Sequence, residues 1–169
     1  MYARLQSSRF ALMAALFGCC GVAHAQVDEN ILKAAFVYNF AMYTTWPMPL
    51  RDSTTLTICV RRSSALAPAL RALAGKPVQE RALAVIEIDA AKAGMRCDVQ
   101  VADARGARPM QRLGVLTICD CSEAEDASSG VILLVREGTR LRFDVDLNAA
   151  AASGLSLSSK LLRLARTTR

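Results

Sequence analysis

The chain has 169 residues, with 21 lysine and arginine residues against 15 aspartate and glutamate residues and a formal net charge of +6. The basic residues are scattered, so the composition excludes the long cationic block of a nucleic-acid-binding arm. The single histidine, His24, lies in a segment that we expect to be removed. Without it, the chain cannot form a Ser-His-Asp or Cys-His nucleophile system or a histidine-ligated zinc site.

The first 25 residues have the three-part pattern of a secretory signal peptide. Arg4 and Arg9 form a short positive region, an uncharged apolar run extends from Phe10 to Ala23, and Ala23-His24-Ala25 supplies small residues for cleavage. The run is shorter than the about 20 apolar residues of a membrane-spanning helix. We therefore expect residues 1–25 to be a cleaved signal peptide and residues 26–169 to form one periplasmic domain. A lipoprotein anchored at Cys19 is the alternative.

Four cysteines remain after cleavage: Cys59, Cys97, Cys119 and Cys121. An even number of cysteines in an exported domain indicates disulfide bonds. Four cysteines allow three complete pairings, and the spacing alone does not choose between them.

A helix is predicted from a cap at Asp28 or Asn30 to about Thr44, where Trp46-Pro47 ends it because the residue before proline leaves the helical region. The helix is apolar nearly all round, with Lys33 and Thr44 on its polar side. Such a helix is buried on more than one side, either inside the domain or against another chain.

Aromatic side chains are concentrated in and just after this helix. They are candidates for a partner surface or a small hydrophobic ligand pocket, and core packing is the alternative. The five residues are Phe36, Tyr38, Phe40, Tyr43 and Trp46. We expect Trp46, near the rim, to be the most exposed of them.

Short apolar runs rich in β-branched residues follow and alternate with helical or polar segments. This alternation is typical of parallel β-α-β units. The polar segment from Asp103 to Gly114 is short, so its crossover helix is expected to be reduced. The runs predict strands at Leu56–Val60, Leu83–Ile88, Asp98–Ala102 and Val115–Cys119, and a helix at Ser63–Ala74.

The pattern changes near the C-terminus. Runs at Val131–Val135 and Leu141–Leu147, joined through a turn at Glu137-Gly138, predict an antiparallel hairpin on which Asp144 and Asp146 face solvent beside Arg140 and Arg142. Asn148 is expected to cap a helix over Ala149–Ser153, and Ser158 or Ser159 a last helix. The predicted fold is a single three-layer α/β domain, with a mainly parallel sheet and an antiparallel C-terminal hairpin.

Three stretches resemble the YfiR family of periplasmic regulators. The first runs from Leu32 to Phe40 and ends in Thr45-Trp46-Pro47. The second combines Leu56-Thr57-Ile58-Cys59-Val60 with Arg96-Cys97-Asp98-Val99. The third runs from Arg142-Phe143-Asp144-Val145 through Gly154-Leu155 to the segment Ser158–Ala165. Together they span almost the whole expected mature chain in the family's order.

The resemblance implies an α/β fold, commonly dimeric, that represses an inner-membrane diguanylate cyclase. The partner would be the periplasmic region of the cyclase, and an outer-membrane lipoprotein or a redox or stress cue would relieve the repression. The expected output is lower cyclic di-GMP and less biofilm. No catalytic residue, metal or cofactor is expected, and a periplasmic sensor module that binds a small ligand is the alternative.

The resemblance also implies a disulfide between Cys59 and Cys97, and two buried free thiols are the alternative. Cys119 and Cys121 then form a possible second, redox-sensitive pair. A metal clip, a bridge to a second subunit and free thiols are the alternatives for these two residues.

Overall fold

The computed structural model describes residues 22–47, 54–89, 95–103, 112–121 and 130–169. Most of the expected signal peptide, including Cys19 and Cys20, and most of the expected crossover between Asp103 and Gly114 lie outside these residues. Eight strands of the described part of the chain form one sheet, and two short strands pair separately.

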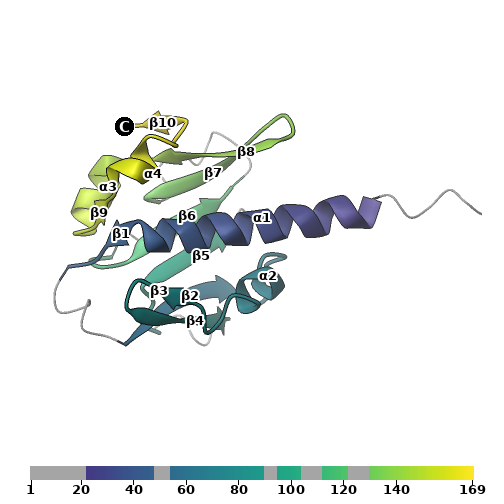
Figure 1. Ribbon diagram of the computed structural model, residues 1–169, viewed down its shortest axis with the longest axis horizontal. Helices are drawn as coiled ribbons and strands as arrows, with labels where there is room; N and C mark the ends of the chain where they lie inside the picture. The colour runs from purple at the N-terminus through teal and green to yellow at the C-terminus, as the bar shows by residue number, and fades with distance from the viewer. Residues whose placement is uncertain (1–21, 48–53, 90–94, 104–111, 122–129) are drawn as a thin grey trace, which may run out of the picture.

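The sheet has the strand order β10-β8-β7-β6-β5-β2-β4-β3 (Figure 1). The pairs from β4 through β2, β5 and β6 to β7 are parallel, whereas β7–β8 and β3–β4 are antiparallel. The predicted single α/β domain, with a mainly parallel sheet and an antiparallel hairpin, is therefore confirmed. The strands of this sheet are β2 Thr55–Arg61, β3 Pro77–Val78, β4 Arg81–Ile88, β5 Val99–Asp103, β6 Leu116–Asp120, β7 Ile132–Glu137, β8 Arg140–Val145 and β10 Thr167–Thr168.

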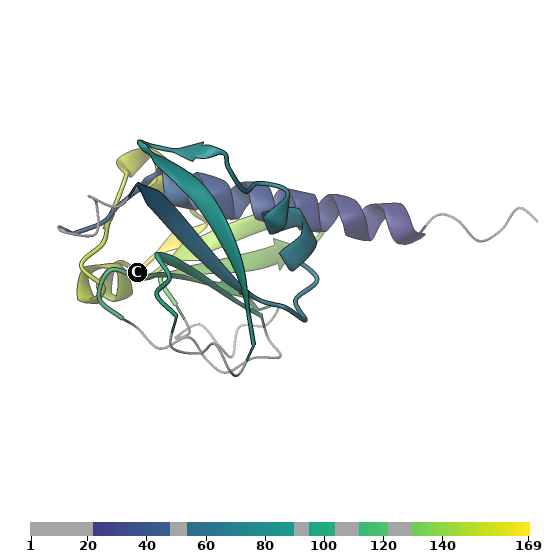
Figure 2. The same ribbon diagram turned by 90° about the horizontal axis from the view of Figure 1, so that it is seen from below.

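The long helix α1, Val22–Met42, crosses one face of the sheet and shares that face with the short helix α2, Ala67–Arg71 (Figures 1 and 2). It ends before the predicted Thr44 because Thr44–Thr45 forms β1, which pairs with β9, Ser156–Leu157. The Thr44 hydroxyl donates to the Phe40 carbonyl oxygen at 2.7 Å. Thr44 is fully buried, so its predicted place on a polar side is wrong.

The inner side of α1 packs into the hydrophobic core. Val37, Phe40 and Ala41 are at most 1% exposed. The rings of Phe36, Phe40 and Phe143 form a cluster of edge-to-face contacts, with the Phe40 and Phe143 centroids 4.9 Å apart. This cluster fixes α1 over the β7–β8 hairpin.

Helix α2 is shorter than the predicted Ser63–Ala74. Pro68 lies in its first turn, where a missing N–H group costs little, so the helix starts at Ala67, just before the proline, and not at Ser63. At the other end, Gly75 has a φ of +82° and carries the chain towards β3.

The C-terminal elements lie at the end of the sheet where β8 finishes (Figure 1). Helix α3, Leu147–Ala152, is capped by Asp146, whose carboxylate accepts from the Ala149 N–H at 2.8 Å, so the predicted cap at Asn148 is wrong. Helix α4, Ser159–Leu162, has Ser158 as its cap. Asp144 does not simply face solvent, because its carboxylate accepts two hydrogen bonds from Arg166.

Ser153, which follows α3, offers a stabilising substitution. The residue is fully buried, and its hydroxyl oxygen has no hydrogen-bond partner within the described segments. A buried hydroxyl without a partner is destabilising. We expect Ser153→Ala to raise the free energy of unfolding by about 0.5–1 kcal/mol in chemical denaturation, and a loss of stability would show that the hydroxyl is satisfied in solution.

Candidate functional site

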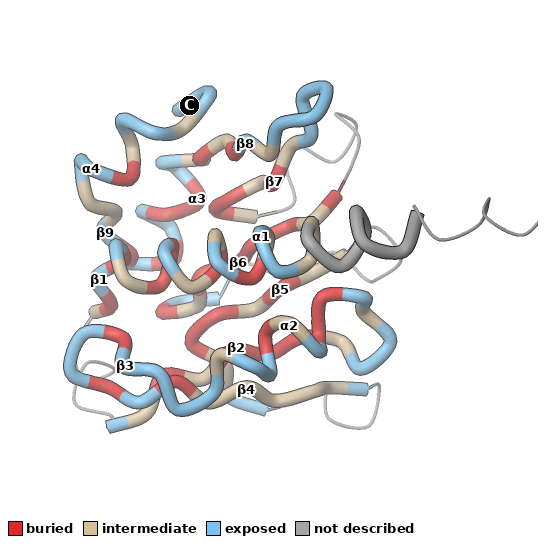
Figure 3. The backbone as a smooth tube through the Cα atoms, turned by 45° about the vertical axis from the view of Figure 1, so that its right-hand side comes forward, coloured by how far each residue is buried: buried red, intermediate tan, exposed pale blue. Residues whose placement is uncertain are grey.

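Helix α1 presents an apolar outer face to solvent. Ile31 is 56% exposed, Leu32 46% and Tyr43 38%, and Ala35 and Asn39 are exposed between them. Residues 31, 35, 39 and 43 follow one another at the four-residue spacing of a helix surface, so they lie in one line. We call Ile31, Leu32, Ala35, Asn39 and Tyr43 the outer α1 face; Figure 3 shows the alternation of exposed and buried segments along the helix.

The five aromatic candidates separate into three groups. Phe40 and Trp46 are buried at 1% and 2% exposure, Phe36 and Tyr38 are partly buried, and Tyr43 is exposed. Of the five, only Tyr43 belongs to the outer α1 face.

The expectation that Trp46 is the most exposed aromatic residue is wrong. Its indole Nε1–H donates to the Asp98 carbonyl oxygen at 3.3 Å, and the Arg81 guanidinium carbon lies 4.7 Å from the ring centroid. The indole is thus covered by a cation–π contact and anchored by a hydrogen bond. Trp46 fixes the exit of α1 to the sheet and does not present a surface.

The sequence reasoning missed Ile31 and Leu32 as exposed residues. Asn39 could have indicated that these residues are exposed, because a polar residue inside an otherwise apolar helix marks the side of the helix that faces water. Lys33 instead suggested that a different side of the helix faces water. Its side chain is only 16% exposed, so its predicted position on a polar side is wrong.

Lys33 instead joins an ionic network beneath the N-terminal half of α1. Its ammonium nitrogen lies 2.8 and 3.0 Å from the two carboxylate oxygens of Asp120 and 3.1 Å from Oε1 of Glu29. Glu29 Oε2 also accepts from Arg136 Nη1 at 2.7 Å. The network therefore links α1 to β6 and to β7.

Charges in this network shift two pKa values. Burial alone would raise the pKa of Glu29, but the hydrogen bond and charge of Lys33, followed by those of Arg136, outweigh it and lower that pKa. Burial likewise would lower the pKa of Lys33, but Asp120 and then Glu29 outweigh it and raise that pKa. Both shifts favour the charged forms.

The network should make stability depend on pH in two windows. A carboxylate with a lowered pKa contributes stability above its unfolded value near 4.5, which is lost as the pH falls below it. A lysine with a raised pKa contributes stability that is lost as the pH rises above 10.5. In a plot of the free energy of unfolding against pH, we expect Glu29→Gln to make the decrease below about pH 4.5 less steep. A decrease as steep as in the wild type would contradict this role.

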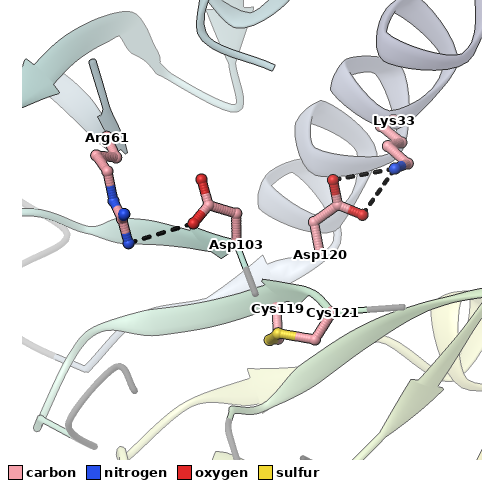
Figure 4. Close-up of a disulfide and its surroundings, with 6 residues drawn as sticks. All are labelled: Lys33, Arg61, Asp103, Cys119, Asp120 and Cys121. Carbon is pink, nitrogen blue, oxygen red and sulfur yellow. Dashed lines mark hydrogen bonds and ion pairs between the residues drawn. A yellow bond between two sulfur atoms is a disulfide. The ribbon is translucent and has the colours of Figure 1, made fainter. Parts of the chain in front are cut away.

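A disulfide lies directly behind the network. Cys119 and Cys121 are bonded to each other, and because neighbouring side chains of a strand point to opposite faces, Asp120 between them points the other way. Figure 4 shows Asp120 directed at Lys33 on α1 and the sulfur atoms on the far side of β6. Cys59 and Cys97 form the other disulfide, with Cα atoms 5.7 Å apart.

A second charged pair lies at the same end of the parallel strands. Arg61 at the end of β2 and Asp103 at the end of β5 are 3.2 Å apart (Figure 4). Strand β4 lies on one side of β2 and strand β5 on the other. The connection that follows β2 therefore leads to one side of the sheet and the connection that follows β5 leads to the other, so the two connections diverge between β2 and β5. Open α/β sheets commonly bind ligands at such a point, but this cation and carboxylate already neutralise each other.

The described residues contain no group of metal-binding side chains. No helix in the described part of the chain is long and apolar enough to span a membrane.

A family model described as YfiR/HmsC-like matches residues 30–166. The chain belongs to the YfiR/HmsC-like family. The resemblance found in the sequence is thereby confirmed. This family is periplasmic and regulatory, so the protein is, in general terms, a periplasmic regulator of diguanylate cyclase signalling. No curated protein matched the chain.

The YfiR/HmsC-like match begins at Asn30. The outer α1 face, Lys33 and all four cysteines described above therefore belong to the family region. The expected signal peptide and Glu29 lie before it.

Proposed function

We propose that the protein binds the periplasmic region of an inner-membrane diguanylate cyclase through the outer α1 face and represses the enzyme. Repression lowers cyclic di-GMP and biofilm formation. The observation that carries this proposal is the exposure of Ile31 and Leu32, two large apolar side chains at successive positions of α1. Large apolar side chains presented together are typical of a binding surface.

The other side of α1 is held firmly, which suits a docking surface. Its inner residues are buried in the core, and the network of Lys33, Glu29 and Asp120 fixes its N-terminal half. A partner that packs on a preorganised helix loses less conformational entropy on binding. An apolar groove or a second helix is the complement that such a face accepts.

Capture of the cyclase by the purified protein tests this surface. The Ile31→Glu, Leu32→Glu double variant replaces two exposed side chains, so it should fold. We expect it to retain at least about tenfold less cyclase from detergent-solubilised membranes, as for a hot spot. Leu113→Glu is the matched control, because Leu113 is 74% exposed but precedes β6, and its side chain lies beside Gly154 and not on α1. Equal capture by the double variant and the wild type would refute the proposed surface.

The proposal also requires export. Residues 1–25 act in it as a cleaved signal peptide, which would remove the first four residues of α1, Val22–Ala25. Intact mass of the protein from a periplasmic extract tests this step. A chain that begins at Gln26 supports it, and one that retains Arg4 and Arg9 contradicts it.

The disulfide between Cys119 and Cys121 offers a route for a redox cue. Its ring contains Asp120, so reduction by a thiol, with the thiol itself oxidised, frees the backbone that aims this carboxylate at Lys33. We expect the Cys119→Ala, Cys121→Ala variant to show faster amide hydrogen exchange in the N-terminal half of α1. Unchanged exchange there would separate the disulfide from α1 and remove this route.

A further inference from the structure

Among the described residues, strand β4 borders the sheet beyond its short pairing with β3. In Figure 3 it lies along the lower edge. Its neighbour β3 pairs only with Arg81 and Ala82, and one further contact joins Leu83 to Gly75 and Lys76. In the described ranges, no strand pairs with the outer side of β4 beyond Leu83.

The hydrogen bonds of β4 determine which backbone groups point outwards. Leu83 donates to Lys76 and accepts from Gly75 on the outer side. Ala82 donates to Thr54, and the Ile88 carbonyl oxygen accepts from Arg62, both on the side of β2. Because these directions alternate along a strand, the N–H and C=O groups of residues 85 and 87 point outwards.

We infer that a second copy of this chain pairs with β4, antiparallel and about a twofold axis at Ile86. Val85 then lies opposite Glu87 of the second copy, and Glu87 opposite its Val85. Both are outward-pointing residues, so each pair exchanges two backbone hydrogen bonds, as hydrogen-bonded pairs of antiparallel sheets do. The two Ile86 side chains meet in the non-hydrogen-bonded pair between them, where side chains approach most closely.

Neighbouring registers are less favourable. An axis at Glu87 would place two glutamates opposite each other, which is destabilising. An axis at Val85 would require the outward groups of Leu83, which already bond to Gly75 and Lys76. The register centred on Ile86 avoids both conflicts, and the Glu87 charge is compensated within each chain by Arg71 Nη2 at 2.5 Å.

Cysteine cross-linking tests the pairing and its register. In a non-hydrogen-bonded antiparallel pair the Cα atoms are about 4.5 Å apart, within the range that a disulfide spans. We therefore expect Ile86→Cys to form a covalent dimer in the purified protein treated with diamide. Ala84→Cys is the matched control on the same face of β4, because its copies would lie about 14 Å apart.

A rate for Ile86→Cys at least about tenfold above that of Ala84→Cys supports the proposal. Equal rates, or no cross-link in either variant, overturn it. Because a new cysteine can exchange with the native disulfides, sedimentation equilibrium of Ile86→Lys, which places two charges opposite each other, gives a second readout. We expect at least about tenfold weaker dimerisation than in the wild type, and an unchanged dimer overturns the proposal.

Discussion

Replacement of Asp98 by alanine should lower the free energy of unfolding by about 3–5 kcal/mol, as expected when one partner of a buried ion pair is removed. Asp98 is 8% exposed, and its carboxylate accepts from the Thr57 N–H at 2.7 Å and lies 3.8 Å from Arg81 Nη1. Alanine leaves the Thr57 N–H without this acceptor and the buried Arg81, 5% exposed, without this carboxylate.

The backbone of Asp98 makes the position central to the fold. Its carbonyl oxygen accepts from the Trp46 indole and from the Leu116 N–H, and its own N–H donates to Thr57. The residue thus joins β2, the start of β6 and the exit of α1. These backbone contacts remain in the alanine variant, so the expected loss measures the carboxylate alone.

A double-mutant cycle in chemical denaturation separates the pair from its surroundings. Asp98→Asn keeps an acceptor for Thr57 and should cost less than Asp98→Ala. The double variant Asp98→Asn, Arg81→Met should lose less free energy of unfolding than the sum of the two single variants. The reason is that Arg81→Met removes the positive charge that Asp98→Asn leaves uncompensated. A loss below about 1 kcal/mol for Asp98→Ala would contradict the role of this buried pair.

Removal of the Cys59–Cys97 disulfide has an expected effect of similar size. The bond spans a sequence separation of 38 residues, for which loop closure gives about 4 kcal/mol. It fixes the chain that enters β5 to β2, next to Asp98. We expect Cys59→Ala, Cys97→Ala to lose about that amount in non-reducing urea denaturation.

The other disulfide is the matched control. Cys119 and Cys121 are two positions apart, so the same loop-closure argument gives only about 1–2 kcal/mol. The Cys119→Ala, Cys121→Ala variant should therefore be clearly more stable than the variant that lacks Cys59 and Cys97. Equal losses in the two variants would show that loop length does not control their stability.

The sequence pattern located the parallel strands because they are apolar runs bounded by polar residues. Predicted and observed strands differ by one or two residues at their ends, as for Leu56–Val60 within Thr55–Arg61. The two-residue strands were not predictable, since Thr44–Thr45 and Ser156–Leu157 become strands only through pairing over a long separation. Such pairing leaves no periodicity in the sequence.

The candidate site was predictable only in part. The pattern identified α1 as a helix with two apolar sides, but not which side faces the sheet. Lys33 and Trp46 misled for the same physical reason: each is a partly polar side chain that is buried because it finds a partner, Asp120 for the ammonium group and the Asp98 carbonyl oxygen for the indole. Sequence spacing does not reveal partners so distant along the chain.

The central claim is repression of a diguanylate cyclase through the outer α1 face, and cyclic di-GMP in the host tests it most directly. Cells lacking the gene should contain more cyclic di-GMP than wild-type cells. Complementation with the wild type or Leu113→Glu should restore the low level, and equal amounts of the Ile31→Glu, Leu32→Glu variant should not. An unchanged level on deletion, or full restoration by the double variant, would contradict the account.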